Sequence, residues 1–332
     1  MPPPTVAPTQ PPVPPPTEPK AEAGPAPTRL ACGEEGPGKP LLPGATGQVD
    51  YLCDGQVWAI DLATGRQTRL VSHAQRIADF AWEPGGSGIA VVTESTHEVL
   101  FWDAATQELH PVMIATDVPN ILSWSPTGEI LVVSPGTDVW RSYQFIARKG
   151  WQLIGEASGM GLRWSPDGRR FATVHGVDVP EYPVQNGASS TLIVGEIDGI
   201  QVATRTVATG DAKSGWRDAL FTEDSALVYR ELNPRDHQQS LSWWLLPPGP
   251  QATPRQLEPD SPLIRQAEES LRRPVYQVDG QNASRIGLSP DGKWALILFR
   301  SLTEVYLIDA ALTGERFLLP GGYHEWVPAA HR

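Results

Sequence analysis

The chain has 332 residues and a formal net charge of -12, and hydrophobic residues make up 40% of it. A protein that holds a phosphate backbone needs a basic surface, so this charge excludes a nucleic-acid partner. The sequence has no run of the roughly 18 apolar residues that a membrane helix requires, which excludes a membrane span within it. Glycine and proline together fill about one position in five, a content typical of a turn-rich chain.

Prolines are concentrated in residues 1–45, which hold 15 of the 34 in the chain. This stretch contains almost no large apolar residue before Leu30, so it cannot bury enough surface to offset the entropy lost on ordering. We therefore expect residues 1–45 to form a disordered, Pro-rich tether that is locally polyproline II. Its start lacks the basic and apolar regions of a signal peptide. We expect that a signal peptide or membrane anchor has been removed upstream.

The two cysteines of the chain are Cys32, which closes the tether, and Cys53, which we expect to open the first strand. We expect a disulfide bond between them, which fits a periplasmic or extracellular location at the cell envelope. Closing a loop of about 20 residues in this way contributes about 3 kcal/mol in the loop-entropy model. Two unrelated buried thiols are the alternative, and mass spectrometry with and without reductant distinguishes the two cases.

From residue 46 onward, short apolar alternations broken by turn residues indicate an all-β fold. A repeat of strand, Pro-(Asp/Thr/Gly)-Gly turn and strand recurs along this part of the chain. Its copies span residues 78–92, 121–133, 161–174 and 286–298. Proline presets φ at the first turn position, Asp or Thr can bond to the backbone, and glycine takes the positive φ that closes a tight hairpin.

One landmark residue closes the first strand of each repeat unit, and degenerate copies extend the series. The landmarks are Trp82, Trp124, Trp164, Phe221, Leu288 and Trp326. A second signal, such as Asp103-Ala-Ala-Thr, marks the next hairpin, so each unit should contain four antiparallel strands. The last landmark strand lacks partners, whereas the domain begins with strands that lack a first one. The sequence therefore predicts a six-bladed β-propeller over residues 46–332, closed by pairing of the C-terminal strand with N-terminal strands.

The motif Trp/Leu-Ser-Pro-Asp-Gly at residues 164–168 and 288–292 resembles the repeats of the six-bladed TolB-like propeller family, a WD-repeat-like group. The resemblance covers roughly residues 46–332 and implies the same propeller fold. The fifth unit departs from the pattern because Phe221-Thr-Glu-Asp-Ser lacks the proline and glycine. Blade boundaries between residues 175 and 285 are therefore left open. We expect the landmark tryptophans to pack between blades.

Three insertions interrupt the repeats, at residues 175–190, 230–240 and 261–273. The last reads as a helix that links the fifth and sixth blades, because Ser261 can cap it, Pro262 suits its first turn and Pro274 ends it. Its apolar face comprises Leu263, Ile264, Ala267 and Leu271. Propellers carry their second-to-third-strand loops and their blade-to-blade connections on one rim, so all three insertions should thicken the same face.

The same rim collects most of the histidines together with other side chains suited to binding, and loops of this kind often carry function. The candidate binding residues are His73, His97, Asp117, His175, Trp216, Arg217, His237, Tyr323 and His324. A metal site needs three or four ligands that converge on one ion, whereas these histidines belong to different blades, so we expect no metal. Solvated loop histidines and a pH-sensitive binding face remain the two interpretations.

Catalytic motifs are absent from the sequence, which contains no Gly-x-Ser-x-Gly, His-Glu-x-x-His, phosphate loop or Cys-x-x-Cys. We therefore predict no catalytic residues and no cofactor. The predicted function is a non-catalytic protein- or peptide-binding module, tethered at a bacterial cell envelope. One alternative is a metal-dependent hydrolase or lyase at the central channel, as some six-bladed propellers are, with acids such as Asp117, Asp178 and Asp218. Another is a structural subunit of an envelope assembly.

Overall fold

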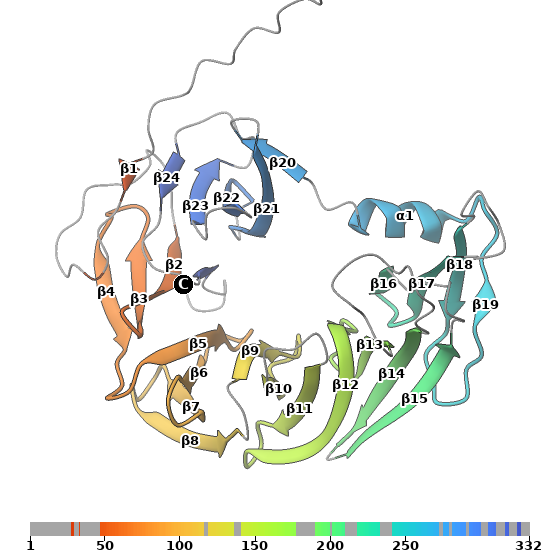
Figure 1. Ribbon diagram of the computed structural model, residues 1–332, viewed down its shortest axis with the longest axis horizontal. Coiled ribbons are helices and arrows are strands. Elements are labelled where there is room, and N and C mark those ends of the chain that lie inside the picture. The colour runs from red at the N-terminus through yellow and green to blue at the C-terminus, as the bar shows by residue number, and fades with distance from the viewer. Residues whose placement is uncertain are drawn as a thin grey trace, which may run out of the picture.

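The computed structural model describes residues 28–29, 33, 47–115, 119–135, 141–176, 190–199, 201–209, 218–232, 241–271, 275–278, 281–289, 292–299, 305–309, 316–318 and 324–326. Figure 1 shows their strands arranged as sheets that follow one another around a ring, with one helix between two of the sheets. The described part of the chain is thus almost entirely β-structure, as the sequence predicts.

We number the sheets 1 to 6 in the order in which the chain visits them. Sheet 1 contains β25 (His324–Trp326), β2 (Gln48–Cys53), β3 (Gln56–Asp61) and β4 (Gln67–Val71). Sheet 2 contains β5 (Ile77–Trp82), β6 (Gly88–Thr93), β7 (Glu98–Asp103) and β8 (Leu109–Ile114). Sheet 3 contains β9 (Pro119–Trp124), β10 (Ile130–Pro135), β11 (Arg141–Ala147) and the start of β12 (Gln152–Trp164).

The second half of the ring follows the same plan with two variations. Sheet 4 contains the end of β12, β13 (Arg170–Gly176), β14 (Ser190–Asp198) and β15 (Gln201–Thr209), so β12 joins sheets 3 and 4 into one seven-stranded sheet. Sheet 5 contains β16 (Asp218–Phe221), β17 (Leu227–Leu232), β18 (Leu241–Leu246) and β19 (Arg255–Gln256). Sheet 6 contains β20 (Val275–Val278), β21 (Gln281–Leu288), β22 (Trp294–Phe299), β23 (Val305–Asp309), β24 (Arg316–Leu318) and β1 (Thr28–Arg29).

Every landmark residue ends the strand that the sequence assigned to it. Trp82, Trp124, Trp164, Phe221, Leu288 and Trp326 close β5, β9, β12, β16, β21 and β25. The C-terminal strand also lies where the sequence placed it, because β25 pairs with β2 in the register Val49 to Trp326 and Tyr51 to His324. Strand β20, which pairs with β21, was not predicted.

The turns between first and second strands close as the motif predicts. Their glycines Gly128, Gly168 and Gly292 have φ of 71°, 66° and 70°. The motif serine accepts the backbone N–H of the residue that opens the next strand, in the pairs Ser125 with Ile130 (3.1 Å), Ser165 with Arg170 (2.8 Å) and Ser289 with Trp294 (2.9 Å). The serine therefore supplies the acceptor that a buried turn N–H requires.

Apolar side chains of neighbouring sheets meet in separate clusters, and the landmark tryptophans lie in them. Trp82 packs against Val57 and Val71 of sheet 1. Trp124 contacts the Phe101 ring of sheet 2 with ring centroids 6.0 Å apart, and Trp164 contacts the Phe145 ring of sheet 3 at 5.9 Å. The expected packing between blades is thus confirmed for Trp82, Trp124 and Trp164, while the Trp326 side chain lies outside the described residues.

Helix α1 (Pro262–Leu271) occupies the place where a neighbouring sheet packs elsewhere in the ring. Its predicted apolar residues Ile264 and Ala267 are buried against Val228, Trp243 and other side chains of sheet 5. The helix begins at Pro262, directly after the predicted cap Ser261, and residues 272–273 of the prediction lie outside the described residues. The other face of sheet 5 packs on sheet 4, so α1 covers the face that points toward sheet 6.

Three residues of the segment 1–45, which we expected to be a disordered tether, are placed against the sheets. Thr28 and Arg29 form a short strand, β1, which pairs in parallel with Phe317 and Leu318 of β24. Gly33 is also placed against sheet 1, where a Cβ on it would lie 3.3 Å from the Trp58 ring. The rest of the segment 1–45 lies outside the described residues. Across the described ranges, no helix is long and apolar enough to span a membrane.

Candidate binding rim

One end of sheets 1 and 2 gathers three loops into a continuous surface. An antiparallel meander places its second-to-third-strand loop beside the connection to the next sheet. These segments are the β2–β3 turn (54–55), the β4–β5 connection (72–76) and the β6–β7 loop (94–97). The Ile77 N–H donates to the Gly55 carbonyl at 2.9 Å, and the Glu94 N–H donates to the Arg76 carbonyl at 2.8 Å. We call this end the connection rim and the opposite end, which carries the motif turns, the turn rim.

Polar side chains link the three loops of the connection rim. The Gln56 side chain accepts the His73 N–H at 3.1 Å and donates to the His73 carbonyl at 3.3 Å. His73 Nδ1 accepts the Gln75 N–H at 3.2 Å, and Gln75 Oε1 accepts the Thr96 hydroxyl at 2.8 Å. This chain of hydrogen bonds orders a polar surface that spans two sheets.

The connection rim also carries an exposed ion pair. Arg76 Nε lies 3.1 Å from Glu94 Oε2, and the two side chains are 65% and 57% exposed. Gly55 permits the close approach of these loops, because a Cβ at its φ of 73° would lie 2.7 Å from Arg76 Cβ. An exposed pair of this kind adds little to stability, so both side chains are available to contact a partner.

The structure places some of the predicted binding residues and leaves others undescribed. His73 and His97 both lie on the connection rim, as predicted, and the hydrogen bond between Gln75 and Thr96 joins their loops. His175 lies near the end of β13 and His324 begins β25, so their strand ends belong to the same rim. Five predicted residues lie outside the described ranges: Asp117, Trp216, Arg217, His237 and Tyr323. Within the described ranges, no group of three or more His, Cys, Asp or Glu could hold a metal ion.

Sequence reasoning missed the side chains that organise this rim. Gln56, Gln75, Arg76, Glu94 and Thr96 carry the contacts between its loops, yet each is a common surface residue type. The only signal in the sequence was their position in loops between strands that alternate apolar and polar residues. In the predicted binding residue His73, the backbone N–H donates to Gln56, and the carbonyl and Nδ1 accept from Gln56 and Gln75.

Two buried aspartates were also missed, and both link neighbouring sheets. Asp50 of β2 accepts the Trp82 indole N–H of sheet 2 at 2.7 Å. Asp79 of β5 accepts the Leu122 backbone N–H of sheet 3 at 3.1 Å. Burial raises the pKa of each carboxyl from 3.8 to about 7, although the hydrogen bonds it accepts act in the opposite direction. Each aspartate therefore has a structural role, because its carboxyl group accepts a hydrogen bond from the first strand of the next sheet.

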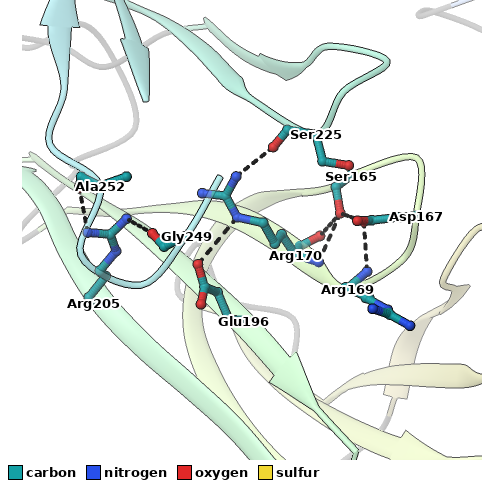
Figure 2. A network of polar contacts seen from close by, with 9 residues as sticks. All are labelled: Ser165, Asp167, Arg169, Arg170, Glu196, Arg205, Ser225, Gly249 and Ala252. Carbon is teal, nitrogen blue, oxygen red and sulfur yellow. Dashed lines mark hydrogen bonds and ion pairs between the residues drawn. The ribbon is translucent and has the colours of Figure 1, made fainter. Parts of the chain in front are cut away.

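At the turn rim, polar contacts connect sheets 4 and 5 (Figure 2). Arg170 donates from Nη1 to the Ser225 carbonyl of sheet 5 at 2.5 Å, and its Nε lies 3.5 Å from Glu196 Oε1. Arg205 donates to the carbonyls of Ala252 and Gly249 at 2.8 and 3.0 Å. Two arginines of sheet 4 therefore bind backbone carbonyls on two turns of sheet 5.

The turn rim carries a similar contact between sheets 2 and 3. Glu83 accepts the backbone N–H and hydroxyl of Ser87, and Arg148 Nη1 lies 3.6 Å from Glu83 Oε1. Burial opposes ionisation of Glu83, but these hydrogen bonds and Arg148 together hold its pKa below the usual value. Gly128 of the next motif turn lies directly on this carboxylate, since its Cβ would be 1.8 Å from Glu83 Oε1. The motif turns thus pack on one another around the rim.

Comparisons with known proteins agree with this architecture. The sequence profile of a family described as eukaryotic translation initiation factor eIF2A matches residues 45–190, less than half of the chain. Among solved structures, the tricorn protease is similar with a TM-score of 0.53 and 11% identity, over 84% of this chain and 34% of that chain. No curated protein matches. With the strand arrangement above, these findings identify the chain as a β-propeller protein.

Two further solved structures are similar with lower scores. TolB from Acinetobacter baumannii has a TM-score of 0.43 and 14% identity, over 85% of this chain and 67% of that chain. A nidogen/laminin complex gives a TM-score of 0.41 and 10% identity, over 81% of this chain and 92% of that chain. Neither match defines a finer family within the β-propeller class.

Proposed function

We propose that the chain is a six-bladed propeller of the TolB-like type, closed by its C-terminal strand. If β12 is counted in both of its sheets, the strands divide into six units of at least four strands. A landmark residue ends the first strand of each unit except sheet 6, where β20 precedes the landmark strand β21. The pairing of β25 with β2 supports the closure, because it supplies the first strand that sheet 1 otherwise lacks. Such a ring leaves few exposed sheet edges.

The propeller acts as a non-catalytic module that binds another protein or peptide through its connection rim. The observation that carries this proposal is the ordered polar surface of Gln56, His73, Gln75, Arg76 and Thr96 on two adjacent sheets. Its side chains are held by hydrogen bonds to one another, so little conformational entropy would be lost when a partner binds. Loops on a rigid scaffold are the usual location of binding surfaces.

We also propose that the Pro-rich segment tethers the propeller at a bacterial cell envelope and that Cys32 and Cys53 form a disulfide bond there. Gly33, the neighbour of Cys32, supports the pairing, because its Cβ position lies 3.4 Å from Cys53 Sγ. Among the described residues there is no free cysteine. Peptide mapping with and without reductant tests the bond, and two free thiols in protein from an oxidising compartment would disprove it.

A pull-down with the immobilised full chain tests the binding surface. We expect a protein from an envelope extract to be retained by the parent chain and by Lys149→Ala, a control on the exposed β11–β12 hairpin of the turn rim. Arg76→Ala should lose this partner while keeping its unfolding midpoint, because the exposed ion pair contributes little to stability. Equal retention by all three proteins would contradict a role for the connection rim.

Two other functions make different experimental predictions. A hydrolase or lyase at the central channel would contain a stoichiometric divalent ion in the purified protein, which metal analysis and a substrate panel would detect. A structural subunit of an envelope assembly would copurify with its partner through high salt and would be insensitive to single rim substitutions. The similarity to the tricorn protease covers only 34% of that chain and concerns the fold alone.

A further inference from the structure

The N-terminal segment touches two sheets within a few residues. Thr28 and Arg29 pair with Phe317 and Leu318 of β24, the outer strand of sheet 6. Gly33 lies instead against sheet 1, next to Trp58 and Cys53. Arg29 therefore lies on sheet 6 and Gly33 on sheet 1, although only four peptide bonds separate them along the chain.

Gly33 is fixed on sheet 1 by both a hydrogen bond and packing. Its backbone forms a hydrogen bond with the Tyr51 phenol, which in turn donates to Gln67 Oε1. A Cβ on Gly33 would lie 3.3 Å from the Trp58 ring and 3.4 Å from Cys53 Sγ, at a φ of 75° that favours glycine. The position therefore requires glycine for its backbone conformation and leaves little room for a larger side chain.

The residues that Gly33 contacts belong to the seam between sheets 6 and 1. Tyr51, Cys53 and Trp58 are buried in one cluster with Leu296, Val305 and Leu307 of sheet 6. The strand pairing that joins the two ends of the described chain, β25 with β2, lies beside this seam, within sheet 1. The chain passes from β24 of sheet 6 to β25 of sheet 1, whereas β2 to β4 lie at the other end of the described sequence, so β25 is joined to them by strand pairing.

We propose that the N-terminal segment acts as a strap that holds sheet 6 against sheet 1 at two described points, β1 (Thr28–Arg29) on sheet 6 and Gly33 on sheet 1. The Cys32–Cys53 disulfide proposed above would make the sheet 1 end of this strap covalent, and this part rests on that proposal. The closure of the ring then depends on three elements: the β25–β2 pairing within sheet 1, the apolar cluster between sheets 6 and 1, and the strap. Reduction of the disulfide by a dithiol, which yields two protein thiols and a cyclic disulfide of the reductant, would loosen the seam without cutting the chain.

Hydrogen exchange of the full chain, read by mass spectrometry, tests the strap. In Gly33→Val we expect peptides of β2, β24 and β25 to exchange faster than in the parent, by about tenfold or more, while peptides of β5 to β8 keep their rates. Gly150→Val is the matched control, because Gly150 has a similar φ of 78° but nothing within 4 Å of its Cβ position. Unchanged exchange at the seam in Gly33→Val, or an equal increase in sheet 2, would overturn the strap.

The covalent part has its own test. Cys32→Ser should raise exchange at the seam by up to about a hundredfold, the factor that closing a loop of this length can supply. Dithiothreitol should produce the same change in the parent chain and no further change in Cys32→Ser. If dithiothreitol leaves the parent unchanged, the disulfide lock is disproved, whereas the Gly33→Val result still decides whether the strap itself is bound. The two failures are thus distinguishable.

Discussion

Trp82 donates its indole N–H to Asp50 Oδ2 at 2.7 Å, and this hydrogen bond joins sheets 1 and 2 inside the protein. Asp50 is 0% exposed, and its other oxygen accepts the Gln48 side-chain N–H at 2.8 Å. Burial raises the pKa of Asp50 from 3.8 to about 7, against the effect of the two hydrogen bonds. The carboxyl group is therefore favoured in its protonated form in mildly acidic solution, where an exposed aspartate is ionised.

This pKa makes the stability of the propeller depend on pH in a defined direction. Between about pH 4 and pH 7 the unfolded chain has released the Asp50 proton while the folded chain retains it. The free energy of unfolding should therefore fall as the pH rises through this window and level off above it. Asp50→Asn keeps an acceptor oxygen for Trp82 but cannot release a proton. We expect it to lose less stability than the parent between pH 5 and pH 8, by roughly 1 to 4 kcal/mol in urea unfolding.

The comparison with the parent isolates Asp50 from other titrating groups. Asp79 shifts in the same direction, whereas hydrogen bonds hold the pKa of carboxyls such as Glu83 below the usual value, so their contribution falls at acidic pH. All of these groups remain in both proteins. Parallel pH profiles for the parent and Asp50→Asn would contradict a protonated Asp50.

Arg170 should contribute strongly to the contact between sheets 4 and 5. It is 5% exposed, and its loss would leave Glu196 and the Ser225 carbonyl without their buried partner. Removal of one member of a buried charged pair typically costs about 3 to 5 kcal/mol, so we expect a loss of this size for Arg170→Ala in denaturant unfolding. The adjacent Arg169 has an exposed side chain, and Arg169→Ala should stay within about 0.5 kcal/mol of the parent. Similar losses for both variants would be inconsistent with the buried contact.

Gly128 tests how tightly the motif turns pack. Alanine at Gly128 meets both a positive φ of 71° and a carboxylate oxygen 1.8 Å from its Cβ, whereas alanine at Gly150 meets only the positive φ of 78°. The backbone cost of about 1 kcal/mol is shared by the two variants. We expect Gly128→Ala to be less stable than Gly150→Ala by about 1 to 3 kcal/mol, because Glu83 must move. Equal thermal midpoints would show that the turns are not in contact.

Helix α1 should behave as part of the core of sheet 5. Ile264 is 8% exposed and packs with Val228, Trp243 and other residues of that sheet. We expect Ile264→Ala to cost about 2 to 4 kcal/mol and to increase hydrogen exchange in β17 and β18. Gln266, on the exposed side of the helix, provides the control Gln266→Ala. A helix that only connects two sheets would instead tolerate both substitutions equally.

The sequence predicted the features that repeat. Landmark residues, hairpin turns and the helix could be located because Ser-Pro-Asp-Gly turns and alternating strands leave a local signal, and each landmark indeed ends its strand. The finer propeller type and blade count stay a proposal. The helix was placed by its cap and apolar face, but the sheet that it covers could not be read from a local pattern.

The contacts that the sequence did not reveal are those between units. Asp50 and Trp82 are 32 positions apart, and Arg170 and Ser225 are 55 apart, so no spacing rule connects them. The polar network of the connection rim depends on which loops meet at one end of two sheets. Strand β1 escaped prediction because two residues in a Pro-rich stretch carry no strand pattern, and its pairing comes entirely from the edge of β24.

The direction of β1 shows from which rim the N-terminal segment reaches the propeller. Strand β1 is parallel to β24, the fourth strand of its unit, which runs from the turn rim toward the connection rim. The chain therefore enters β1 from the side of the turn rim. Under the tether proposed above, the attachment point of the propeller is therefore on the turn-rim side of sheet 6. The surface around His73 and Arg76 lies at the opposite rim, so a partner bound there would not meet the attachment point.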